Sequence, residues 1–124
     1  MIDDQTTAYM LSVQVYFEDL KQVAAQLAGL LVLEAAGATP DHPMLASASQ
    51  AYKNAADGLK SIRVTARARV HHKHLLAAAA KLDEALRASG DKLRLLEGAY
   101  AELRSASKIL PGFQMISFER GCCA

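Results

Sequence analysis

Residues 45–86, LASASQAYKNAADGLKSIRVTARARVHHKHLLAAAAKLDEAL, form the stretch that decides the fold. Apolar residues recur along this stretch at helical spacing, but they follow two different stripes. The first stripe consists of Leu45, Ala48, Tyr52, Ala55, Leu59, Ile62 and Ala66, and the second of Val64, Ala68, Leu75, Ala79, Leu82 and Leu86. At about 100° per residue, the two stripes lie on nearly opposite sides of one helix. The stretch therefore buries one face in its first half and the opposite face in its second half.

We predict that this stretch belongs to one long helix over residues 43–89. No proline or glycine lies between Leu59 and Gly90, so the region has no strong helix breaker. Such a helix would be about 70 Å long. The alternative is a break near Gly58 or Thr65, which would give a bundle of four shorter helices.

Two further helices flank the long one. The first begins at Asp3 or Asp4 as the N-cap and ends near Gly37. Its inward stripe contains Tyr9, Val13, Tyr16, Leu20, Val23, Ala24, Leu27, Leu30 and Leu31. The last turn, residues 30–33, is apolar all round, so it must be covered on more than one side. The third helix covers about residues 91–110 and stops at Pro111.

The expected fold class is all-α, an elongated antiparallel helical bundle of three long helices. The first helix covers one half of the long helix, and the third covers the other half on the opposite side. Residues 1–110 form the bundle domain, and residues 111–124 form an ordered C-terminal tail that packs on it through Phe113, Ile116 and Phe118. Two-helix layers bury little apolar surface, so we expect the chain to be a homodimer.

Composition places the chain among globular single-domain proteins. It has 124 residues, of which 52% are hydrophobic and 22% are charged, which excludes the disordered class. The longest apolar run, residues 27–33, is too short to span a bilayer. Cys122 and Cys123 are adjacent and give no intrachain disulfide framework, so a cytoplasmic, reducing location is expected.

Charge is strongly segregated although the net charge is only +1. Residues 1–57 carry seven acids and two bases, whereas residues 58–82 carry six bases and no acid. We expect the acidic first helix to lie beside the basic segment, either within one chain or across a dimer.

A cluster of histidines, His71-His72-Lys73-His74, is the densest polar feature. His71 and His74 are three residues apart and share one face of a helix, close enough to bind one metal ion. Thiolates from Cys122 and Cys123 would complete a Cys2His2 ligand set suited to zinc. This predicts a metal- or redox-responsive helical protein as one alternative. An exposed histidine in an all-α bundle is also typical of histidine phosphotransfer modules, but no motif here assigns the chain to that family.

Basic residues form a stripe on the same predicted helix. Lys60, Arg63 and Arg67 are the candidate anion-binding residues, since a basic helical face can contact phosphate groups. No aromatic residues interleave with them and no helix-turn-helix pattern is visible, which disfavours sequence-specific binding of nucleic acid. A basic anion-binding bundle is therefore the third hypothesis.

No arrangement typical of an enzyme appears in the sequence. The serines have no recognisable base or nucleophile elbow around them, and the tyrosines lie on predicted core stripes. We therefore expect a non-enzymatic module for protein–protein interaction, without a cofactor, that acts as a homodimer and binds an unidentified protein partner.

Overall fold

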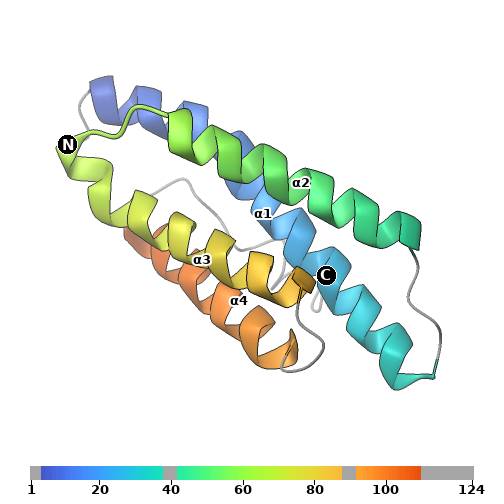
Figure 1. Ribbon diagram of the computed structural model, residues 1–124. Coiled ribbons are helices and arrows are strands. Elements are labelled where there is room, and N and C mark those ends of the chain that lie inside the picture. Colours follow the sequence, from blue (N-terminus) through green and yellow to red (C-terminus); the bar gives the residue numbers. More distant parts are fainter. Residues whose placement is uncertain (1–3, 38–41, 88–91, 110–124) are drawn as a thin grey trace, which may run out of the picture.

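The computed structural model describes residues 4–37, 42–87 and 92–109. These residues form an all-α bundle: α1 spans Asp4–Ala35, α2 His42–Ser61, α3 Arg69–Arg87 and α4 Lys92–Ile109, with a short 3-10 helix, η1, at Ala66–Ala68. Two antiparallel hairpins, α1–α2 and α3–α4, lie side by side (Figure 1). The fold class is confirmed as all-α, but the described residues form four principal helices and not three.

The predicted continuous helix over residues 43–89 is wrong, and the alternative, a break near Thr65 that gives four helices, is confirmed. α2 ends at Ser61, and residues 62–65 have no helical structure before η1 begins. Thr65 has extended backbone dihedrals (φ −78°, ψ 162°), and its hydroxyl accepts a hydrogen bond from the backbone N–H of Ala68 at 3.3 Å. The same hydroxyl lies 3.3 Å from that of Thr6 on α1. The chain therefore turns at a capping threonine that is also held by the first helix.

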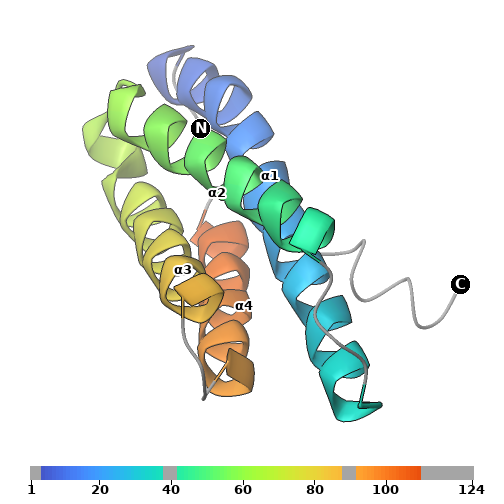
Figure 2. The same cartoon turned by 45° about the vertical axis from the view of Figure 1, so that its right-hand side comes forward.

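Local chemistry favours this turn even without a proline. Ile62, Val64 and Thr65 are β-branched, and such residues lose side-chain freedom in a helix. The hydroxyl of Ser61 donates to the carbonyl of Asp57 at 2.8 Å, in the last turn of α2. Because the chain reverses here, the two apolar stripes belong to two helices, and each helix faces the shared core. The consequence is a compact pair of hairpins joined at one end (Figure 2).

The core is built around one face of α1. Its fully or almost fully buried members are Tyr9, Val13, Phe17, Leu20, Val23, Ala24, Leu27 and Leu30. Opposite them lie Ala55 and Leu59 of α2, Leu75 and Leu82 of α3, and Leu96 and Leu103 of α4. The predicted stripe of the first helix is thus confirmed, except that Phe17 joins it and that Tyr16 and Leu31 are only partly buried.

Small residues bring some of the helices close together. The buried positions of α3 and α4 include the small residues Ala78, Ala85, Ala99 and Ala106, and these two helices are packed closely together. Gly58, on α2, lies beneath the ring of Tyr16. The alternative prediction allowed the helix to break near Gly58. Gly58 instead lies within α2, at a close contact with Tyr16 of α1.

The outer helix boundaries agree with the sequence. Gly37 has a positive φ of 83°, and its N–H donates to the carbonyl of Glu34, as expected for a glycine that ends a helix. α4 ends at Ile109, close to the predicted stop. The predicted tail, residues 111–124, lies outside the described residues. Of the described helices, none combines the length and the apolar character needed to cross a membrane.

Candidate functional site

The three histidines of segment 71–74 contact three different helices. Their partners are Tyr9 on α1 for His71, Leu59 on α2 for His72, and Glu102 on α4 for His74. Neighbouring helical positions point in different directions, so one short segment at the start of α3 reaches all the other principal helices. The histidine cluster therefore connects the two hairpins.

His71 and Tyr9 form a buried polar pair. Nδ1 of His71 lies 2.8 Å from the hydroxyl oxygen of Tyr9, and the two rings meet edge-on with centroids 5.5 Å apart. Burial lowers the pKa of His71 to about 4, with smaller contributions from His72 and His74. Burial also raises the pKa of the Tyr9 phenol. At neutral pH the phenol stays protonated and donates to a neutral imidazole, so the pair is a structural contact and not an acid–base couple.

His72 completes the end of α2. Its Nε2 donates to the carbonyl of Leu59 at 2.7 Å. The last carbonyl groups of a helix have no partner within that helix, so a side-chain donor stabilises them. His72 therefore helps to end α2 before the turn.

His74 joins α3 to α4 through an ion-pair network. Its Nδ1 donates to Glu102 at 2.6 Å, while Lys81 donates to the other carboxylate oxygen at 3.2 Å. The hydrogen bond from His74, assisted by Lys81, lowers the pKa of Glu102. Glu34 of α1 also pairs with a base on α4, Lys92, at 3.6 Å. Glu34 of α1 and Lys81 of the 58–82 segment therefore each form an ion pair with a residue of α4.

The side chains of the predicted zinc ligands His71 and His74 contact different helices. His71 is buried against α1, whereas His74 is half-buried against α4. Among the described residues there is no group of three or more His, Cys, Asp or Glu that could hold a metal ion. Cys122 and Cys123 lie outside the described residues, so the four-ligand zinc site and the redox role stay predictions.

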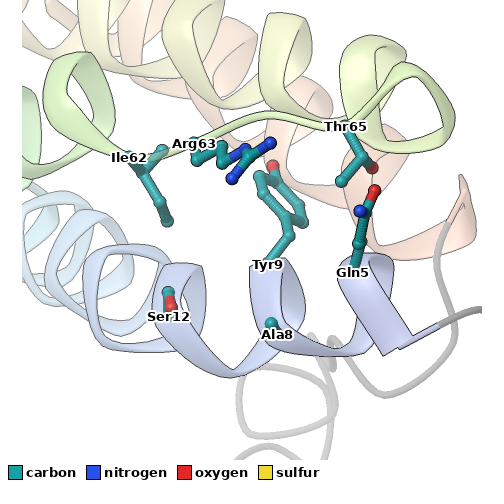
Figure 3. A pocket seen from close by; sticks show the side chains of 7 residues that line it. All are labelled: Gln5, Ala8, Tyr9, Ser12, Ile62, Arg63 and Thr65. Carbon is teal, nitrogen blue, oxygen red and sulfur yellow. The ribbon is translucent and has the colours of Figure 1, made fainter.

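Of the predicted anion-binding residues, Arg63 alone lines the cavity at the turn. Lys60, Arg63 and Arg67 are all exposed at the corner where α2 leads into η1 and α3. Beside Arg63 is a cavity of about 180 Å³. Its walls consist of Gln5, Ala8, Tyr9 and Ser12 from α1, and Ile62, Arg63 and Thr65 from the connection (Figure 3).

Sequence reasoning missed this cavity because the predicted continuous helix contains no turn. Tyr9 carried only the signal of a core residue, and Thr65 only that of a helix break. The first turns of α1 and the 62–65 connection meet only after the chain reverses.

Comparisons with protein-family models, curated proteins and solved structures find no match to this chain.

Proposed function

We propose that this protein is a non-enzymatic interaction module that forms a homodimer through the outer face of α1. The observation that carries the proposal is the exposure of large apolar side chains on that face. Leu11, Val15 and Val32 are 69%, 61% and 69% exposed, and Leu33 is 37% exposed. In the apolar turn 30–33, the single chain buries Leu30 but leaves Val32 outside. These side chains form one apolar pair at each end of the face, with the exposed Glu18 and Gln22 between them, and exposed apolar groups bordered by polar residues mark protein–protein contacts.

The spacing of these residues suits a symmetric partner. Leu11 and Leu33 lie equally far before and after Gln22, about three helical turns in each direction. Val15 and Gly29 are likewise equidistant from Gln22, at about two turns. Two antiparallel copies of α1 related by a twofold axis at Gln22 would therefore place Leu11 on Leu33 and Val15 on Gly29. Self-complementarity of this kind is what a twofold interface requires.

Gly29 supports a close approach at this face. A β-carbon at this position would meet no atom within 4 Å, so packing within the chain does not require a glycine. Glycine inside a helix costs about 0.5–1 kcal/mol relative to alanine. A second helix passing over Gly29 would account for its presence, because glycine lets two backbones come close together.

A cysteine at the twofold axis tests both the dimer and its geometry. In a background with Cys122→Ser and Cys123→Ser, the Gln22→Cys variant should form a disulfide-linked dimer under mild oxidation, visible on a non-reducing gel. The matched control is Lys73→Cys, which places an exposed thiol on α3 and should stay monomeric on the gel. Light scattering of the parent should give about twice 13.3 kDa at micromolar concentration.

The outcomes separate the parts of the proposal. A monomer mass at micromolar concentration would exclude the dimer. A dimer mass without a Gln22→Cys link would place the interface on another face. Leu11→Asp should convert the dimer to a monomer without lowering the helix content, since Leu11 is exposed in the single chain. The proposal retains the cytoplasm as the expected compartment, which the adjacent cysteines favour.

A further inference from the structure

We infer that the cavity between the start of α1 and the 62–65 connection binds a small organic carboxylate, with Arg63 holding the carboxylate group. The inference does not rest on the proposed dimer, although Ala8 and Ser12 of the cavity lie on α1 within one turn of Leu11 and Val15. The argument rests on how the cavity is built, on its charge and on its shape.

The walls of the cavity are held in place from several sides. Thr65 contacts Thr6 of α1 and caps η1, so the connection is attached to the bundle at this point. The inner wall is the ring of Tyr9, which is 2% exposed and is fixed by its hydrogen bond to His71. A site whose walls do not move on binding loses less free energy to ordering.

Charge at the cavity favours an anion. Arg63 is the only charged residue among the seven that line it. In the described part of the chain, no carboxylate lies within ion-pair distance of Arg63. The exposed Lys60 adds positive potential at the same corner. A guanidinium group presents two parallel N–H donors, which match the two oxygens of a carboxylate.

The remaining walls favour a ligand with a short apolar body. Ala8, Ile62 and the Tyr9 ring present carbon, while Gln5, Ser12 and Thr65 supply neutral polar groups. In Figure 3 the side chains of Gln5 and Thr65 extend toward each other at one end of the cavity, and Arg63 lies near the Tyr9 ring. At about 180 Å³ the cavity is smaller than a site for a drug-sized ligand, so it suits a single ring or a short chain.

Titration with benzoate tests the inference. Benzoate carries one carboxylate on one ring, benzamide is its neutral counterpart, and inorganic phosphate is an anion without an apolar body. In two-dimensional 1H–15N spectra of the full chain, benzoate should shift the amide signals of Gln5, Ser12, Arg63 and Thr65 saturably. Benzamide and phosphate should each bind at least about tenfold more weakly than benzoate, because each lacks one of the two recognised features.

Matched variants assign the binding to this cavity. Arg63→Gln should weaken benzoate about tenfold, whereas Lys60→Gln, which removes a neighbouring charge outside the cavity, should change the affinity by about twofold or less. Ala8→Leu should fill the cavity and abolish binding, while Ala101→Leu, at an exposed position of α4, should leave it intact.

Several results would overturn the inference. One is the absence of any saturable shift up to about 10 mM benzoate. Equal benzoate affinity in the parent and in Arg63→Gln would remove the role of Arg63. Equal affinity for benzamide would exclude recognition of charge, and equal affinity for phosphate would exclude the apolar part of the ligand. Because the Ala8→Leu test keeps Arg63, it decides the location even if Arg63→Gln folds poorly.

Discussion

The ring of Tyr16 lies directly over the α-carbon of Gly58, in the space that a β-carbon would occupy. The closest ring atoms are Cε1, Cζ and Cδ1, which all face that position. Gly58 is buried in the last turn of α2, and Tyr16 reaches it from near the middle of α1. The two helices of the first hairpin can approach at this point only because position 58 has no side chain.

Gly58→Ala should destabilise the fold, because the added methyl group collides with a ring and not with a flexible chain end. We expect a loss of about 1–3 kcal/mol in the free energy of unfolding, measured by urea denaturation. The control is Gly98→Ala, where a β-carbon would lie 3.0 Å from Cδ of the Lys81 side chain, which can move aside. Its effect should be about 1 kcal/mol or less in either direction. Equal losses in both variants would contradict the proposed role of Tyr16.

Stability should fall in mildly acidic solution because of His71. Its pKa is lowered from 6.5 to about 4 in the folded chain, so the unfolded chain takes up a proton first as the pH falls. The stabilisation is complete above about pH 6.5 and is lost as the pH falls toward 4, by about 1–3 kcal/mol in total. Urea denaturation at a series of pH values measures this slope.

His71→Gln should flatten the slope between pH 6.5 and 4.5, whereas His72→Gln should retain it. The carboxylate of Glu102 affects the free energy of unfolding over a different pH range. Its pKa is lowered below 4.5, so its stabilising effect is present above 4.5 and is lost only at lower pH. A pH dependence that persists unchanged in His71→Gln would show that another group is responsible.

Leu20→Ala and Leu82→Ala should each cost about 2–5 kcal/mol, because both side chains are fully buried and their truncation leaves a cavity. Leu93→Ala provides the control, since Leu93 is 59% exposed and its truncation should change stability by about 0.5 kcal/mol or less. Thermal or urea denaturation of the three variants checks this. If Leu20→Ala or Leu82→Ala matched the control, the assignment of the core would be wrong.

Thr65→Ala should cost about 1 kcal/mol, since it removes the side-chain cap of η1 and the contact with Thr6. Thr65→Ser keeps the hydroxyl and should retain most of the stability. Circular dichroism adds a second measurement. The helical signal of Thr65→Ala should not increase, because the turn at 62–65 is also held by the packing of α3 against the core. An increase would mean that α2 and α3 had fused into the continuous helix.

Sequence patterns predicted the helices and their buried faces well. The stripes containing Leu20, Leu59 and Leu82 all reach the core, and both outer helices begin and end close to the predicted residues. Periodicity reports which side of a helix is apolar, and this holds whatever the neighbouring helix is.

The same rules predicted the turn at residues 62–65 only as the alternative, a break near Thr65, and favoured a continuous helix instead. Ile62, Val64 and Thr65 weaken a helix only slightly, and no proline or glycine marks the break. The packing of α3 against α1 determines that the chain turns here, and these two helices are far apart in the sequence. The cavity beside Arg63 depends on that same packing, so it could not be predicted.

The histidine contacts bear on how this bundle keeps one arrangement. Small buried side chains such as Ala78 and Ala99 restrict the sliding and rotation of packed helices less than large side chains do. Hydrogen bonds that join His71, His72 and His74 to three separate helices permit only one rotation of α3 about its axis. Directional polar contacts therefore supply the uniqueness that the small core residues lack. Replacing all three histidines with leucine would leave a helical protein with several interchanging packings.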